Sequence, residues 1–229
     1  MAITIGEDLY HKQTKAVAEP FDEVEAERVT RLRAFIREAE DAAEREWRAS
    51  PKPLSELKRY SFALDESLTP RKLRLVSGEV KWDYFGRIGF GGCGTVSARF
   101  RDVIERIEPG VHQFIPFDLY DKNDQRIDVA LYAWRIRTAL DAIDPSLGGV
   151  KPLEIAGVTP PGGGPDHLWT IRTGGGREKL AVRKELIAGR AAWRDVRFPT
   201  RKFVSDAVVS LLEEQGLTGW SAQDDWKEI

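Results

Sequence analysis

The stretch TVSARFRDVIERIEPG, residues 95–110, decides the fold because it predicts where a strand ends and a helix begins. Ser97 has a side chain that can cap the first turn of a helix. The apolar residues that follow recur with the spacing of one helix face: Phe100, Val103, Ile104 and Ile107. Pro109-Gly110 then predicts the end of the helix.

A second stretch, FVSDAVVSLLEEQG at residues 203–216, repeats this arrangement. Val204 precedes Ser205 as Val96 precedes Ser97, and about three helical turns with an apolar face follow before Gly216. Two copies of a strand, a capping serine and a helix indicate related halves. We expect both to pack on one sheet rather than to form separate domains.

Residues 20–49 predict a long helix at the N-terminal side of the chain. Asp22 can cap it, with Glu25 as the reciprocal partner, and Pro51 closes it. One apolar stripe follows the helical period: Val29, Leu32, Ile36, Ala39, Ala43 and Trp47. Acidic residues outnumber arginines here, which favours a solvated outer face over an acidic partner-binding face.

Residues 172–202 carry the opposite charge, with basic residues in excess. This segment could pair with the acidic helix inside the same fold, which we favour. It could also attract an anionic surface, and a regulator that binds nucleic acid through it is one alternative function.

The remaining segments predict strands. Tyr60–Leu64 and Leu73–Val76 are apolar patches, and QFIPFDLYD and QRIDVALYAWRIR alternate around a turn at residues 122–124, which predicts a hairpin. HLWTIR and EKLAVR predict a second hairpin around residues 173–176. We therefore expect one α+β domain, a mixed and largely antiparallel sheet packed with two serine-capped helices and the long N-terminal helix. Residues 1–80 would supply the charged helix and lead-in strands, and residues 81–229 the core, in one compact unit.

Composition narrows the class of protein. A formal charge of −2 in 229 residues lacks the basic surplus of a dedicated nucleic-acid binder. A single cysteine forms no internal disulfide and fits a reducing compartment. The N-terminal residues contain no apolar core of a secretory signal, and no apolar run is long enough to span a membrane. We expect a cytoplasmic protein.

The candidate catalytic motifs are weak. GFGGCG, residues 89–94, matches a dinucleotide-binding pattern, but no buried strand leads into it, so we expect a flexible loop and no cofactor. Cys93 precedes a helix and could act as a nucleophile with a histidine, although a lone cysteine is more often a small core residue. His11, His112 and His167 lack metal-ligand spacing. We assign no catalytic, cofactor or metal residues.

Four segments together resemble a known family. They are residues 95–124, LYAWRIRTALDAIDPS (131–146), HLWTIR (167–172) and KFVSDAVVSLLEEQGLTGW (202–220). In this order they are similar to immunity protein family eleven of bacterial polymorphic toxin systems, over about residues 82–222. The N-terminal helix lies outside that resemblance. The resemblance implies a non-enzymatic protein, encoded beside a toxin, that binds this toxin and protects the producing cell.

A binding function directs attention to loops and exposed aromatic residues. Loops 86–94 and 159–166 are candidate contacts, because loops on a rigid scaffold often carry recognition. Trp220 and Trp226 lie among polar residues, where exposed aromatic side chains would suit an interface. The resulting candidate contacts are Arg87, Phe90, Asp166, Trp220 and Trp226. A small enzyme that uses Cys93 is the other alternative function.

Overall fold

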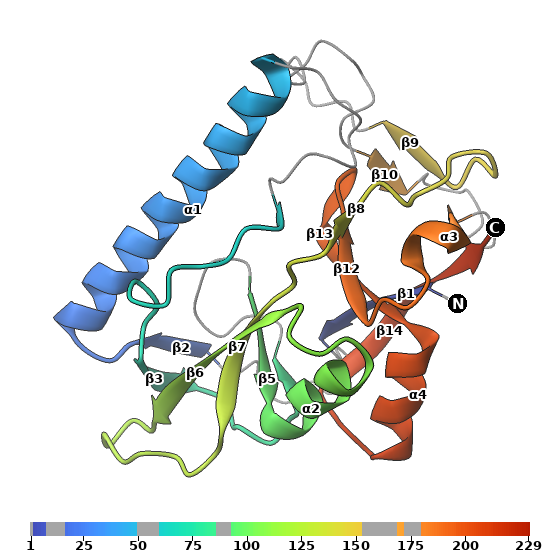
Figure 1. Ribbon diagram of the computed structural model, residues 1–229. Coiled ribbons are helices and arrows are strands. Elements are labelled where there is room, and N and C mark those ends of the chain that lie inside the picture. Colours follow the sequence, from blue (N-terminus) through green and yellow to red (C-terminus); the bar gives the residue numbers. More distant parts are fainter. Residues whose placement is uncertain (1, 8–16, 50–59, 86–92, 153–168, 172–179) are drawn as a thin grey trace.

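Two six-stranded sheets and a pair of adjacent helices form the centre of the computed structural model, which describes residues 2–7, 17–49, 60–85, 93–152, 169–171 and 180–229 (Figure 1). The first sheet has the order β11-β14-β1-β13-β12-β8. Its strands are β1 (Ala2–Glu7), β8 (Ala139–Leu140), β11 (Ala181–Val182), β12 (Ala192–Asp195), β13 (Phe198–Ser205) and β14 (Trp220–Glu228). Its pairs are antiparallel except β11–β14 and β8–β12, which are parallel.

The second sheet has the order β2-β3-β6-β7-β5-β4. Its strands are β2 (Val17–Pro20), β3 (Lys72–Ser77), β4 (Tyr84–Phe85), β5 (Gly94–Ser97), β6 (Gln113–Tyr120) and β7 (Leu131–Arg135). Only the β3–β6 pair is parallel. A separate antiparallel ladder joins β9 (Val150–Pro152) to β10 (Trp169–Ile171). The expected mixed, largely antiparallel α+β architecture is confirmed, but it is built from two large sheets instead of one.

Both predicted serine caps are confirmed. Ser97 Oγ accepts the Phe100 amide at 3.2 Å and starts α2 (Ala98–Ile107). Ser205 Oγ accepts the Val208 amide at 3.4 Å and starts α4 (Asp206–Glu214). The two helices pack against each other, α2 on β5 and β7, α4 on β13 and β1. Because each helix covers a different sheet, the two halves cannot share one sheet as expected.

Three apolar clusters separate the layers. The central cluster contains both helices and one face of each sheet, with Phe100, Trp134, Ile3 and Val204 among its members. The other face of the second sheet packs on α1 (Glu23–Ala49). The other face of the first sheet packs beneath β9–β10 and α3 (Lys184–Ile187). Figure 1 shows α1 along the outside of the second sheet.

The N-terminal helix is confirmed, and Val29 and Leu32 lie buried on its inner face. Asp22 Oδ1 accepts the Glu25 amide at 2.9 Å, as expected of a cap. The Glu25 carboxylate instead accepts the Arg71 amide at 2.8 Å and pairs with Arg28 at 3.2 Å. It therefore fastens the helix to the strand that follows, rather than to the cap.

The hairpin of β6 and β7 is confirmed, but one strand prediction and one predicted strand pairing are wrong. Tyr60–Leu64 is not a strand, because its backbone hydrogen-bonds to a side chain instead of to a neighbouring strand. Leu64 N donates to Gln113 Oε1 at 2.8 Å, and Gln113 Nε2 donates to Leu64 O at 2.9 Å. HLWTIR and EKLAVR form strands, but their described residues do not pair with each other. β10 pairs with β9, while β11 runs parallel to β14, and alternation alone does not specify a strand's partner.

Strands from before residue 81 lie inside both sheets. β1 is inserted between β13 and β14, and β3 pairs with β6. The N-terminal segment therefore shares its cores with the later part of the chain.

Candidate functional site

The predicted contact residues divide into three groups. Arg87, Phe90 and Asp166 lie outside the described residues. Trp220 is partly buried against the central cluster, and its Nε1 donates to Leu217 O at 2.9 Å. Trp226 is 0% exposed and packs on Phe203 with ring centroids 5.3 Å apart. The prediction that Trp226 is an exposed anchor is wrong, because its strand turns this side chain into the core below β9–β10.

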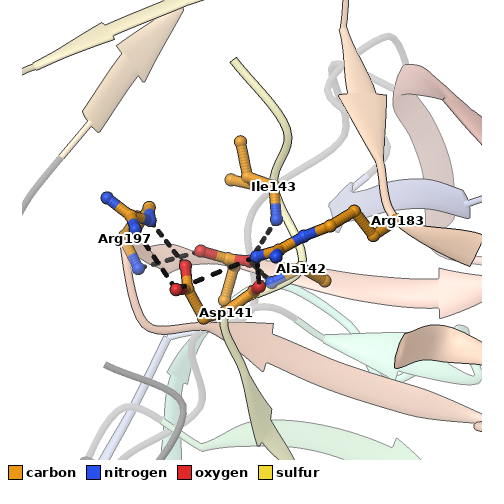
Figure 2. Close-up of polar contacts among 6 residues, drawn as sticks. Asp141, Ala142, Ile143, Arg183 and Arg197 are labelled. Atoms are coloured by element: carbon orange, nitrogen blue, oxygen red, sulfur yellow. Dashed lines mark hydrogen bonds and ion pairs between the residues drawn. The ribbon is translucent and has the colours of Figure 1, made fainter. Parts of the chain in front are cut away.

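A polar cluster of Asp141, Asp195, Arg183 and Arg197 supports the β9–β10 ladder (Figure 2). The Arg197 guanidinium donates two hydrogen bonds to the Asp141 carboxylate, from Nε to Oδ1 at 2.5 Å and from Nη2 to Oδ2 at 3.2 Å. Arg183 donates to the Asp141 carbonyl oxygen. The same guanidinium lies 5.3 Å from the ring centroid of Trp169, whose amide donates to Arg197 O at 2.8 Å. The β9–β10 ladder is thus held through Arg197.

Asp195 closes this cluster from the interior and is 0% exposed. Its Oδ2 accepts the amides of Ala142 and Ile143 at 2.8 and 2.9 Å, and its Oδ1 accepts the Arg197 amide at 2.8 Å. Burial raises the pKa of Asp195 to about 6, and the nearby charge of Asp141 adds to this rise. The hydrogen bonds from the three amides act in the opposite direction and lower the pKa. The carboxylate therefore fixes the AID segment of the family-like motif to the end of β12.

Asp195 should make stability depend on pH. Below about pH 4 the carboxyl is protonated in both folded and unfolded chains, but as pH rises through 6 the folded protein must ionise a buried group. The free energy of unfolding should therefore fall by about 3 kcal/mol between pH 4 and 7, relative to an Asp195→Asn variant. Urea unfolding of both proteins across this range measures the difference.

Asp144 provides a control of opposite sign. Hydrogen bonds from the Ser146 hydroxyl and amide lower the pKa of Asp144, so its contribution is present above its unfolded pKa and is lost as pH falls. Asp144→Asn should thus lose stability relative to wild type at neutral pH and lose none in acid. Parallel pH profiles for wild type and Asp195→Asn would contradict the assignment.

A second polar network supports the β4–β5 hairpin, which leads into the other candidate loop. Asp83 Oδ1 accepts the Ser97 hydroxyl at 2.7 Å, and Asp83 Oδ2 accepts the Thr218 amide at 3.0 Å. Asp83 N and Tyr84 N both donate to Thr218 O, at 3.1 and 3.2 Å. This network joins the first serine cap to the GLTG turn after α4, two motifs that lie far apart in the sequence.

Cys93 lacks the environment of a nucleophile. It is 5% exposed in the core of the second sheet, and burial raises the pKa of its thiol, although the charges of Arg135, Arg194 and Lys202 oppose the rise. The protonated thiol therefore prevails at neutral pH, whereas nucleophilic attack needs the thiolate. His11 and His167 lie outside the described residues.

His112 belongs to a structural cluster. Its Nδ1 accepts the Arg137 amide at 3.4 Å, which leaves the proton on Nε2, 3.3 Å from Glu108 Oε2. Burial lowers the pKa of His112 against the opposing charge of Glu108, so the ring is neutral at pH 7. Glu108 also accepts the Ala191 amide at 2.8 Å and pairs with Arg190 at 2.9 Å.

Four arginines of the basic segment interact with acidic residues inside the fold. Arg190 pairs with Glu108, and Arg183 and Arg197 pair with Asp141. Arg194 is 8% exposed and interacts electrostatically with Glu40 of the acidic helix. Among the described residues, the ion pairs of this segment are made with Glu108 and Asp141, which lie outside the long helix. The expected pairing with the helix is limited to the electrostatic interaction between Arg194 and Glu40.

A metal site, a membrane-spanning helix and a dinucleotide-binding turn find no support in the part of the chain that is described. Within those residues, no group of three or more His, Cys, Asp or Glu side chains could hold a metal ion. None of the described helices is long and apolar enough to cross a membrane. Gly94 enters a strand directly, and the helix begins only after Ser97, unlike a dinucleotide-binding turn, in which the helix starts at the glycines.

These features define an α+β protein in which buried carboxylates hold together segments that are distant in sequence. Comparison with family models then identifies it: the Immunity protein family (Imm11) model matches residues 24–225, and the chain belongs to this family. No curated protein matches the chain. The family match includes α1, so the expectation that the N-terminal helix lies outside the shared region is wrong.

Proposed function

We propose that this protein is a cytoplasmic, non-enzymatic immunity protein that binds a cognate bacterial toxin, encoded by a neighbouring gene, and blocks its activity. The observation that carries this proposal is the family match over residues 24–225, which includes strands of both sheets. An interface of about 800 Å² on each partner would suffice for stable inhibition.

The buried carboxylates support a binding role. Asp83, Asp195 and Glu108 each accept bonds from segments distant in sequence, so their charges are used to fix backbone positions. A surface that is ordered before it meets its partner loses less conformational entropy on binding. Such a frame suits a protein that works by affinity.

The candidate contact surface comprises the two loops that these clusters support. Arg87 and Phe90 lie in the sequence between β4 and β5, and Asp166 lies between β9 and β10. Trp220 adds a partly buried aromatic side chain at the start of β14. Trp226 is not retained, since its side chain is inside the core.

Co-expression with the toxin domain of the neighbouring reading frame tests the proposal. Wild-type protein should restore growth, and Cys93→Ala should restore it equally, because the thiol is a small core group. Arg87→Glu combined with Phe90→Ala should reduce the protection at least tenfold in toxin dose. Loss of protection in Cys93→Ala, with a normal expression level, would favour the cysteine enzyme instead.

A further inference from the structure

The two sheets are built on the same strand registers, displaced by a constant number of residues. In the β4–β5 pair Tyr84 lies opposite Val96, and Phe85 opposite Thr95. In the β12–β13 pair Ala192 lies opposite Val204, and Trp193 opposite Phe203. The displacement is 192 − 84 = 108 for the first strand and 204 − 96 = 108 for the second.

The parallel pairs repeat the same displacement. Leu73 lies opposite Leu119 in β3–β6, and Ala181 lies opposite Lys227 in β11–β14. Here too 181 − 73 = 108 and 227 − 119 = 108. A single displacement therefore relates residues 73–119 to residues 181–227 at both ends of the unit.

The caps and helices obey it as well. Ser97 and Ser205 are 108 residues apart, and their amides donate to Asp83 O at 2.8 Å and to Ala191 O at 3.0 Å, acceptors that are also 108 apart. α2 contacts β5 and β7, and α4 contacts β13 and β1. The similarity thus extends well beyond the two short motifs seen in the sequence.

One strand, β1, lies at a different place in the sequence from its equivalent in the other sheet, β7. β7 lies between β5 and β6 and follows β6 in sequence, with Leu131 opposite Ser97. The equivalent place between β13 and β14 is occupied by β1, with Ala2 opposite Ser205. β1 is antiparallel to both neighbours, as β7 is.

We infer that the chain contains two copies of one unit, and that β1 is the closing strand of the second copy, moved to the N-terminal side by circular permutation. Agreement of one displacement at two strand pairs and at the caps has little chance of arising independently. The copies differ where α1 is inserted in one and β9–β10 in the other. These insertions cover the outer faces of their respective sheets.

Circular permutants test this inference directly. Ala2 lies opposite Trp226, and Figure 1 shows the two chain ends on the same side, so a short Gly/Asn linker can join Ile229 to Met1. Opening the joined chain between Glu7 and Val17 places β1 directly after β14, as β7 follows β6. We expect cooperative unfolding with a midpoint within about 10 °C of the unpermuted chain.

A second permutant exchanges the roles of the copies. Opening the same joined chain between Asn123 and Asp124 makes β7 the leading strand, as β1 is now, and it should also unfold cooperatively. A matched control opened between Ser97 and Ala98 divides a unit at its cap and should not fold. If both hairpin permutants fail to unfold cooperatively, or if the control folds as well as they do, the inference is overturned.

Hydrogen exchange on the unpermuted chain tests the same inference without rearranging the chain. A closing strand should open only with its unit, so the amide of Ile5 should exchange within about tenfold of the rate of the Trp134 amide, which occupies the equivalent place in β7. Exchange of Ile5 more than about 100-fold faster, as for a frayed terminal strand, would overturn the inference whatever the permutants do.

Discussion

Replacing Gly219 with alanine is expected to lower the free energy of unfolding by about 4 kcal/mol, a large part of the stability of a domain. Gly219 has a φ of +86°, and a Cβ at this position would lie 2.4 Å from Tyr84 O and 2.6 Å from Trp82 Cβ. The strain of a left-handed alanine adds to a clash with backbone that the Asp83 network holds in place. Urea unfolding measures the loss.

Gly189→Ala is the matched control. Gly189 has a φ of +74°, but an alanine Cβ at this position would meet no atom within 4 Å. It should therefore show the conformational strain alone, about 1 kcal/mol. Equal losses for Gly219→Ala and Gly189→Ala would show that the close approach to Tyr84 does not matter.

Replacing Glu108 with alanine is expected to lower the free energy of unfolding by about 3 kcal/mol. The change removes the carboxylate that buried groups between the two copies interact with. The Ala191 amide, at 2.8 Å, loses its acceptor, and His112 Nε2, at 3.3 Å, loses its negative neighbour. Arg190 is 42% exposed and can return to water, so its share of the cost is small. Thermal and urea unfolding both report the effect.

Two variants separate this effect from the loss of any carboxylate. Glu108→Gln keeps an oxygen for the Ala191 amide and should cost about 1 kcal/mol. Glu105→Ala removes a half-buried carboxylate that accepts the Gly110 amide at 3.0 Å, and it should change stability by about 0.5 kcal/mol. A Glu108→Ala protein as stable as Glu105→Ala would refute the role of Glu108.

Local signals predicted the helices well. The serines at 97 and 205 and the aspartate at 22 cap helices because their side-chain oxygens accept an amide three residues later, a relation contained within each segment. The β6–β7 hairpin is equally local, since its turn residues lie between its strands. The family-like motifs lie between residues 95 and 220, inside the match at residues 24–225, whose N-terminal part they did not reveal.

Long-range partners could not be predicted in this way. Alternation in EKLAVR indicates a strand but does not reveal that Ala181 pairs in parallel with Lys227. The Gln113 side chain that pairs with Leu64, 49 residues away, has no signal in the sequence. Trp226 lies among polar residues in the sequence, yet its position in β14 directs it into the core, so the local polarity misled the prediction of its exposure.

Titration of the purified toxin domain with the purified protein tests the central claim most directly. If inhibition comes from tight binding, toxin activity should fall linearly and reach its end-point near one molecule of this protein per toxin, independent of incubation time. Full toxin activity at a large excess of the protein would contradict the account. So would progressive inactivation by a small fraction of an equivalent, which requires turnover.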